Sequence, residues 1–189
     1  MSRELRIGVL ALQGNFREHI ATLAGLGVEA VEVRKPAHLE GLDGLVIPGG
    51  ESTAIGRLIG LYDFEEPLRD FDGAVFGTCA GMILLARGGL LGQVDIGVSR
   101  NAYGRQLASF EADLPLEGDD LPLRGVFIRA PRVTEVGEGV DVLARFEGDP
   151  VLLRQGRFLV ASFHPELTSD TRVHERFLDL VREELHVGA

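Results

Sequence analysis

Apolar and polar positions alternate between strand-like and helix-like spacing along the first half of the chain. The segment Leu5–Leu12, which is apolar apart from Arg6, is typical of a buried strand. Asn15 is placed to cap a helix that ends at Gly27 and presents one apolar face, made of Phe16, Ile20, Leu23 and Leu26. The pattern returns with strands predicted at 28–33, 44–47 and 74–77 and with helices predicted to begin near Ser52 and at Cys79. Such alternation predicts a parallel sheet with helices on both faces.

The second half changes character, because short strand patterns follow one another with little helix between them. They cover 96–98, 125–129, 140–146, 151–154 and 158–163, and Arg154–Arg157 has the composition of a hairpin turn. This run predicts antiparallel strands that extend one edge of the sheet. A last helix is predicted to begin near Ser169-Asp170, with a core face of Val173, Phe177, Leu180, Val181 and Leu185. We therefore expect a single domain, residues 1–189, of the three-layer α/β class with a mostly parallel central sheet, helices on both faces and an antiparallel edge extension.

Length and composition fit one globular domain and exclude several classes of protein. The chain has 189 residues, of which 45% are hydrophobic and 25% charged. Its net charge of -10 disfavours nucleic acid as a partner. No apolar run approaches the ~20 residues of a membrane span, and the run near the start is too short for a secretory signal. A single cysteine excludes an internal disulfide. We expect a cytoplasmic protein that binds neither nucleic acid nor membranes.

The segment around Cys79 has the form of a turn that presents a nucleophile. A strand pattern leads into Cys79, and the helix-like apolar run Met82–Leu85 leads out. This is the arrangement of the G-x-S-x-G elbow, with a thiol in place of the hydroxyl. Gly77 and Gly81 stand where a side chain would crowd the turn or the facing strand. Because a lone cysteine is often only a small buried hydrophobe, the interpretation depends on a histidine partner.

His164 is the best placed of the five histidines to be that partner. It ends the apolar run 158–163 and precedes Pro165-Glu166. A residue before proline is pushed to extended geometry, in which residues two apart project to the same side. An imidazole held by a carboxylate is the general base that a thiol needs, although a strand end could also combine these residues by chance. We predict a catalytic triad of Cys79, His164 and Glu166, and we expect His174 and His186 at the surface.

Backbone N–H groups for an oxyanion hole are expected at two places. Ala80 directly follows the nucleophile, and Gly49 and Gly50 follow a neighbouring strand, where glycine lets the backbone approach closely. The Gly49–Thr53 segment also lies between a strand and a helix, as a phosphate loop does. It lacks the P-loop lysine, and Glu51 would repel phosphate. The oxyanion interpretation is therefore preferred.

Several sequence blocks resemble one family. The cysteine elbow with a distant His-Pro-Glu is similar to the class I (triad) glutamine amidotransferases. More specific blocks narrow the resemblance to the glutaminase subunits of pyridoxal 5'-phosphate synthases: Leu12-Gln13-Gly14, Glu18-His19, PGGEST at 48–53, RNAYGRQ at 100–106, SFEA at 109–112, FIRAP at 127–131 and SFHPEL at 162–167. These blocks are spread over nearly the whole chain in the family's order.

The resemblance implies that the protein hydrolyses L-glutamine to glutamate and ammonia, with no metal or other cofactor. Cys79 would form a glutamyl thioester, His164 would move the protons, and Glu166 would orient His164. The positions that would contact glutamine are Gly50, Glu51, Ser52, Arg105, Ile128 and Arg129. The chemistry agrees, because an arginine pairs with the α-carboxylate of glutamine and an acidic side chain favours its α-ammonium group. Without the resemblance, surface ion pairs would be the simpler interpretation of both arginines.

The resemblance also implies a partner. Ammonia would pass to a (β/α)8-barrel synthase subunit that makes pyridoxal 5'-phosphate, within a large hetero-oligomer. Gln13, Glu18 and His19 are expected to face this partner, and Gln13 to help complete the oxyanion site on docking. Two alternatives stay open: a cysteine-elbow hydrolase or redox-sensing protein of the same fold, and a non-catalytic assembly subunit. Such elbow proteins often carry histidine directly after the cysteine, and Ala80 stands there. The intact triad set argues against loss of catalysis.

Overall fold

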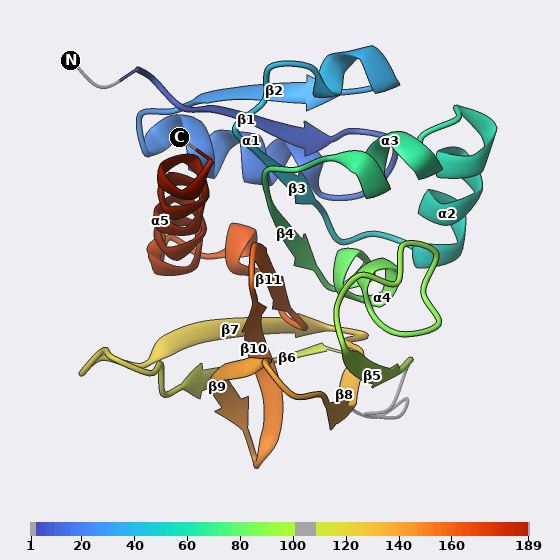
Figure 1. Cartoon of the computed structure of the whole chain (residues 1–189). Coiled ribbons are helices and arrows are strands. Elements are labelled where there is room, and N and C mark those ends of the chain that lie inside the picture. Colours follow the sequence, from blue (N-terminus) through green and yellow to red (C-terminus); the bar gives the residue numbers. More distant parts are fainter. Residues whose placement is uncertain (1–2, 101–108, 189) are drawn as a thin grey trace.

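The computed structural model of the protein describes residues 3–100 and 109–188, and a seven-stranded sheet runs through the centre of this described part (Figure 1). In sheet order the strands are β2 (Glu29–Val33), β1 (Arg6–Leu10), β3 (Gly44–Ile47), β4 (Ala74–Thr78), β11 (Phe158–Ala161), β10 (Asp149–Gln155) and β9 (Asp141–Phe146). Neighbouring strands from β2 to β11 are parallel to each other, whereas β10 runs antiparallel to both of its neighbours, β11 and β9. The predicted mostly parallel sheet with an antiparallel edge is confirmed.

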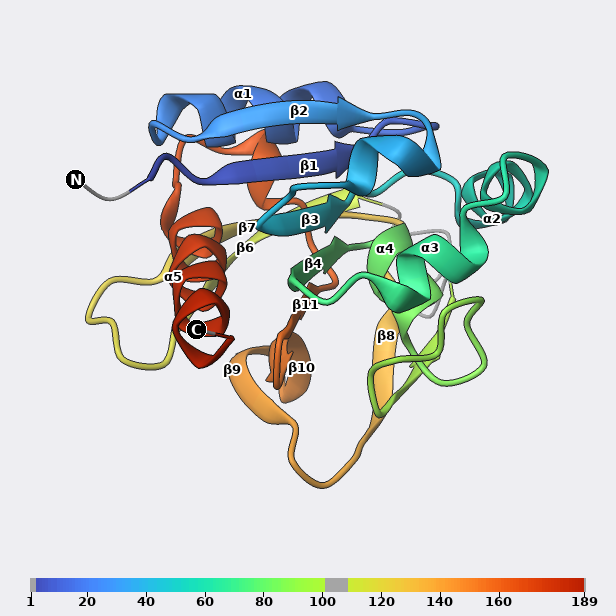
Figure 2. The same cartoon turned by 45° about the horizontal axis from the view of Figure 1, so that its top comes forward.

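Helices cover both faces of the sheet. The helices α1 (Phe16–Gly25) and α5 (Arg172–Val187) lie on one side, and α2 (Ser52–Leu61), α3 (Glu65–Asp70) and α4 (Ala80–Leu85) lie on the other (Figure 2). Alternate strand residues supply the two cores, because successive side chains point to opposite faces. In β4, for example, Phe76 joins the α1 and α5 side, and Val75 joins the α2 to α4 side. The three-layer architecture is therefore built into the strand pattern.

The antiparallel second half differs from the prediction in detail. Within the described residues, β5 (Ile96–Ser99) pairs with β8 (Arg132–Val136), and β6 (Ser109–Leu114) pairs with β7 (Leu123–Ile128), in two small separate sheets. Among the described strands, β10 and β9 are the antiparallel ones that extend the main sheet. The hairpin turn between β10 and β11 is confirmed, and Gly156 takes a positive φ of 55° there. Strands with few buried residues, such as β8, leave too weak an apolar pattern to be recognised.

The last helix corrects two expectations. It begins at Arg172, and Leu185 is 40% exposed, so this leucine does not belong to its core face. His174, expected at the surface, is fully buried between the helix and the sheet side that contains Phe76. His186 is exposed, as expected.

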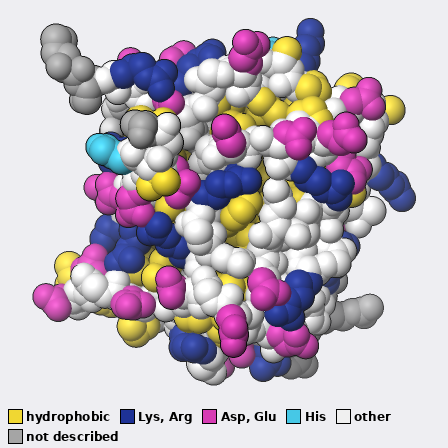
Figure 3. Space-filling model, viewed as in Figure 1, with side chains coloured by type: hydrophobic (Ala, Val, Ile, Leu, Met, Phe, Trp, Pro, Cys, Tyr) yellow, Lys and Arg dark blue, Asp and Glu magenta, His cyan; other side chains and the backbone are white. Residues whose placement is uncertain are grey.

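Charged side chains of both signs are mixed over the face seen in Figure 3, with no block of a single sign. This mixture of charges is expected, because the acidic residues are spread along the whole sequence. In the part of the chain that the structure describes, no helix has both the length and the apolar character needed to cross a membrane.

Candidate active site

Cys79 occupies a sharp turn between β4 and α4. Its backbone has φ 50° and ψ -103°, a conformation that L-residues adopt only under constraint. The Cys79 N–H donates to the Ala161 carbonyl at 2.8 Å, which ties the turn to β11. A Cβ on Gly81 would lie 2.1 Å from the Ile47 carbonyl oxygen, so only glycine lets α4 approach β3 so closely. The structure confirms the predicted sharp turn from strand to helix at Cys79, whose side chain is 7% exposed.

The predicted histidine and carboxylate meet directly beside this turn. His164 Nδ1 lies 2.6 Å from Glu166 Oε1, and both side chains are buried. The backbone between them is not extended, because Pro165–Leu167 forms a short 3-10 turn, η3. The contact was therefore predicted correctly, but a tight turn rather than a strand end produces it. The His164 N–H donates to the Val126 carbonyl at 2.8 Å, which positions the histidine against β7.

The electrostatics of His164 couple it to Cys79. Burial lowers the pKa of His164, but hydrogen bonds with Cys79 and Glu166 outweigh burial and raise this pKa to about 10. The histidine therefore carries its proton at neutral pH. An adjacent imidazolium favours the thiolate form of a cysteine, which is the reactive form. The Cys79 Sγ also lies 3.9 Å from the Ile128 carbonyl oxygen, at the end of β7.

The loop at 48–51, here called the oxyanion loop, only partly matches its prediction. The Gly49 N–H donates to Thr78 Oγ1 at 3.1 Å, so in this conformation it is not directed at a substrate. The Gln13 side-chain oxygen accepts from the Glu51 N–H at 2.8 Å and so holds the loop from the segment that follows β1. The Ala80 N–H lies at the first position of α4, where helix geometry supplies no partner for it. Ala80 is thus better placed than Gly49 to donate to a substrate.

A pocket of about 480 Å³ opens above Cys79, a size suited to a small ligand. Its lining contains the predicted residues Gly50, Glu51, Ser52, Cys79, Ile128, Arg129 and His164. It also contains Asn15, Ile83 and Arg100, which sequence reasoning did not assign. The Asn15 side chain makes no helix cap, and its amide nitrogen lies 3.5 Å from His164 Nδ1. Arg100 is the first residue of the family-specific block RNAYGRQ, and this position could have marked it as a candidate site residue.

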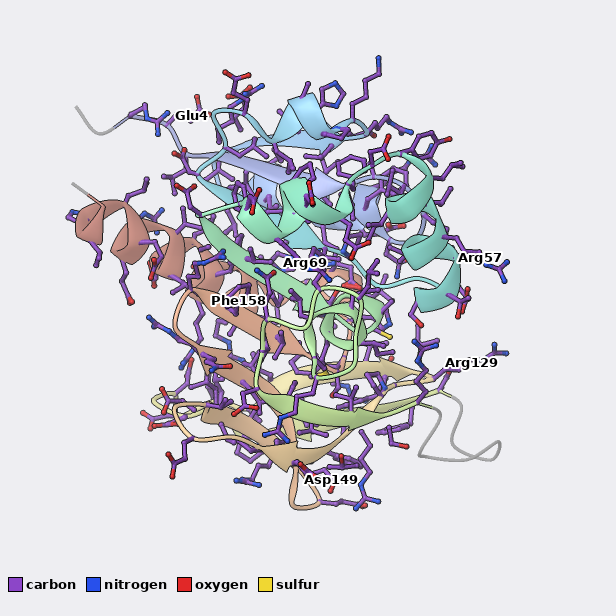
Figure 4. The ribbon with its side chains drawn as sticks, turned by 45° about the vertical axis from the view of Figure 1, so that its right-hand side comes forward. Glu4, Arg57, Arg69, Arg129, Asp149 and Phe158 are labelled. Carbon is purple, nitrogen blue, oxygen red and sulfur yellow. The ribbon has the colours of Figure 1, made fainter. Side chains whose placement is uncertain are left out.

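The polar groups at the pocket mouth carry opposite charges. The Glu51 carboxylate caps α2 by accepting from the Thr53 and Ala54 N–H groups, and these backbone hydrogen bonds lower its pKa. Arg129 has a positive φ of 45°, and its side chain points outward from the end of β7 (Figure 4). Arg100 reaches Thr53 Oγ1 at 3.4 Å. Arg105, predicted to bind glutamine, lies outside the described residues.

The residues expected to face a partner are placed differently from one another. Glu18 is exposed and Gln13 is half-buried. His19 is fully buried, so the expectation that its side chain faces a partner is wrong. Its Nδ1 lies 2.8 Å from His174 Nε2, and its Nε2 lies 3.2 Å from Thr78 Oγ1. Helix amphipathicity could have suggested burial, because His19 lies one helical turn before Leu23 on the same face of α1.

Buried neutral histidines predict a loss of stability toward acid. Burial lowers the pKa of His174 to about 4, so below pH ~6.5 the unfolded chain takes up a proton that the folded chain does not. Stability is then lost as the pH falls from 6.5 toward 4. His164 acts in the opposite direction, because its raised pKa stabilises the fold fully below pH ~6.5 and this contribution disappears as the pH rises through about 10.

A comparison of variants isolates the contribution of His174. Between pH 7.5 and 5.5 the free energy of unfolding should change in wild type and in His174→Gln by amounts that differ by about 1 kcal/mol, with the wild type more acid-sensitive. Urea denaturation at both pH values measures this difference, and His186→Gln, an exposed change on the same helix, is the control. Parallel pH dependences of wild type and His174→Gln would contradict the prediction.

Known proteins of similar sequence and fold agree with the chemistry that this geometry suggests. The pattern of the SNO glutamine amidotransferase family matches residues 9–183. The chain is 53% identical over 188 residues to the pyridoxal 5'-phosphate synthase subunit PdxT of Niallia circulans, with 95% of this chain and 99% of that protein covered. It is 56% identical over 185 residues to the protein of the same name from Thermus thermophilus, covering 92% and 96%. A solved structure described as a glutamine amidotransferase superimposes with a TM-score of 0.86 at 53% identity, covering 93% of this chain and 98% of that one.

Proposed function

This chain belongs to the SNO glutamine amidotransferase family, and we propose that it hydrolyses L-glutamine to glutamate and ammonia as the glutaminase subunit of a pyridoxal 5'-phosphate synthase. The observation that carries the proposal is the buried His164–Glu166 pair, 2.6 Å apart, beside the strained Cys79 turn at the floor of a pocket. Residues 1–189 form one glutaminase domain in this proposal, and Cys79, His164 and Glu166 are its catalytic triad.

The reaction proceeds in two steps. The Cys79 thiolate attacks the side-chain amide carbon of glutamine, and the proton of His164 passes to the amide nitrogen as the C–N bond breaks. Ammonia leaves, and a glutamyl thioester remains on Cys79. His164 then accepts a proton from water, the resulting hydroxide attacks the thioester carbon, and glutamate and the thiol are released. Glu166 holds His164 in the required orientation throughout, through Nδ1.

The pocket mouth offers charges that match the amino-acid end of glutamine. The Glu51 carboxylate suits the α-ammonium group, and an arginine guanidinium suits the α-carboxylate. Arg100 and Arg129 line the pocket, and both are candidates for the carboxylate contact, together with Arg105. Gly50, Ser52 and Ile128 complete the binding surface in the proposal.

Activity depends on the synthase partner. We take this partner to be a (β/α)8-barrel subunit in a large cytoplasmic hetero-oligomer that receives ammonia before water protonates it. The Gly49 N–H is engaged with Thr78, and Gln13 holds the neighbouring Glu51 N–H. Docking next to Gln13 and the exposed Glu18 would turn the oxyanion loop so that a donor from Gly49 or Gly50 joins Ala80. One oxyanion donor is worth ~100- to 1000-fold in rate.

The test measures glutamate and ammonia release by the isolated chain and by the chain mixed with a pyridoxal 5'-phosphate synthase barrel subunit. We expect glutaminase turnover to rise at least ~100-fold on addition of the partner, because an oxyanion donor is gained. Addition of an unrelated barrel enzyme is the control. Absence of glutamine hydrolysis in the mixture, or hydrolysis of other amides and esters in preference to glutamine, would overturn the proposal in favour of a different cysteine-elbow hydrolase.

A further inference from the structure

A chain of buried polar groups lies behind the triad and is not used by the reaction as described above. His19 of α1 and His174 of α5 are fully buried, and their rings approach at 2.8 Å between Nδ1 and Nε2. On its other side, His19 Nε2 lies 3.2 Å from Thr78 Oγ1 and 3.3 Å from Glu166 Oε2. Buried polar side chains are costly unless they are paired, so this grouping calls for a role.

Glu166 needs a second donor. One carboxylate oxygen, Oε1, binds His164, and within residues 3–100 and 109–188 the other, Oε2, has no aligned hydrogen-bond partner. His19 Nε2 lies close enough to fill this place after a small rotation of the ring. A carboxylate oxygen only accepts hydrogen bonds, so a bare ring nitrogen facing it would be repelled. The environment of Glu166 therefore favours a His19 ring that carries its proton on Nε2.

His174 decides whether His19 can carry its proton there. Burial lowers the pKa of both histidines, so both rings are neutral at pH 7 and each bears one proton. With the His19 proton on Nε2, its Nδ1 is an acceptor and His174 Nε2 must donate to it. His174 Nδ1 is then a bare acceptor, and in the described part of the chain this atom has no hydrogen-bond partner. The opposite arrangement would leave a buried N–H donor unpaired, which is rarer and more costly.

We propose that His19 and His174 are a positioning pair for catalysis: His174 donates to His19 Nδ1, and His19 donates from Nε2 toward the second carboxylate oxygen of Glu166. The pair holds the plane of the carboxylate, and the carboxylate in turn holds His164 toward Cys79. The inference rests on the proposed glutaminase function and adds two residues, from α1 and α5, to the support of the triad.

The same pair also contacts the oxyanion loop. Thr78 Oγ1, which faces His19 Nε2, accepts the hydrogen bond from the Gly49 N–H. Thr78 precedes Cys79 directly and closes the strand β4. His19 therefore lies between the carboxylate that orients the catalytic base and the hydroxyl that holds the loop. A ring that turns away from Glu166 would disturb both.

The tautomers test the proposal without any assay of activity. Long-range proton–nitrogen NMR of the ¹⁵N-histidine-labelled protein at pH 7 reports which ring nitrogen carries each proton, and spectra of His19→Gln and His174→Gln assign the two signals. We expect both rings neutral, with the proton on Nε2. A His19 proton on Nδ1, or a charged ring, would overturn the arrangement.

Kinetics of the complex with the synthase subunit test the consequence. We expect His174→Leu to lower kcat for glutamine on the order of tenfold with KM unchanged, because the reacting groups lose their alignment. His174→Gln keeps a donor near the position of Nε2 and should recover most of this loss, and the exposed His186→Leu is the control. Equal kcat in His174→Leu and wild type, or equal losses in the leucine and glutamine variants, would overturn the positioning role. Lack of glutaminase activity in the wild-type complex would instead overturn the proposed function, and the NMR result would still decide the hydrogen-bond arrangement.

Discussion

Replacement of Cys79 by alanine is expected to lower glutamine hydrolysis by the complex at least ~10⁴-fold, the largest effect of any single change in this chain. Without the sulfur no thioester can form, and the remaining groups only bind and polarise the substrate. The alanine keeps the Cβ and so the strained φ of 50°, which preserves the turn apart from the missing thiol. Glutamate formation over hours in the complex measures the residual rate, and thermal unfolding verifies that the variant is folded.

A chemical control is available because Cys79 is the only cysteine in the sequence. One equivalent of iodoacetamide should label wild type at a single site and abolish activity in parallel with labelling, whereas Cys79→Ala should take up no label. Glutaminase activity that survives in Cys79→Ala, or that survives complete alkylation of the wild type, would contradict the assignment of the nucleophile.

The central strands of the main sheet could be predicted from the sequence because they are buried on both faces. Continuous apolar runs such as Gly44–Ile47 stand out, and this strand was predicted with its observed bounds. The helix α3 and the strands β6 and β8 were not predicted. In β6 polar and apolar residues alternate, with Phe110, Ala112 and Leu114 on the face that packs against the core, and α3 has Leu68 as its buried residue. The six-residue α3 is too short to show a helical period, whereas the alternation in β6 is a half-buried strand signal that the prediction missed.

The proximity of Cys79 and His164 could be predicted because it obeys a rule of parallel sheets. Cys79 follows β4 and His164 lies just beyond β11, and these strands are neighbours, so their carboxyl ends bring the two residues together. The contact between His19 and His174 follows no such rule. His19 and His174 are 155 residues apart, and each stands on the apolar face of an amphipathic helix where a histidine gives no sign of its partner. Only the packing of α1 and α5 on the same face of the sheet joins them.

The hydrogen bond from the Gly49 N–H to Thr78 could not be predicted from the sequence either. A Pro-Gly-Gly loop after a strand predicts free backbone N–H groups, but the direction of one peptide depends on a neighbour such as Thr78. Thr78 is the last residue of β4 and stands one residue before Cys79, and its hydroxyl oxygen accepts from the Gly49 N–H. Tertiary contacts therefore determine the orientation of the loop, and local sequence patterns do not reveal such contacts.

Exchange of Glu166 for glutamine is expected to lower kcat at pH 7 by about 100-fold or more, by analogy with loss of the orienting carboxylate in other triads. The amide has nearly the same shape but no charge, and its N–H₂ group can turn toward His164 Nδ1 in place of an acceptor. The pKa of His164, raised to about 10 by Cys79 and Glu166 together, should fall once the carboxylate charge is gone. The ring then no longer holds its proton beside the thiol at neutral pH.

The loss of charge in Glu166→Gln predicts a second result that a general loss of folding would not produce. The rate of iodoacetamide reaction with Cys79 should fall across pH 6 to 7, because the neighbouring imidazolium that favours the reactive thiolate is lost. Glu138→Gln, an exposed change on the loop between β8 and β9, is the matched control and should leave both kcat and the alkylation profile unchanged. An alkylation profile in Glu166→Gln that superimposes on wild type would mean that His164 owes its proton to Cys79 alone, and that Glu166 holds the ring in place without contributing its charge.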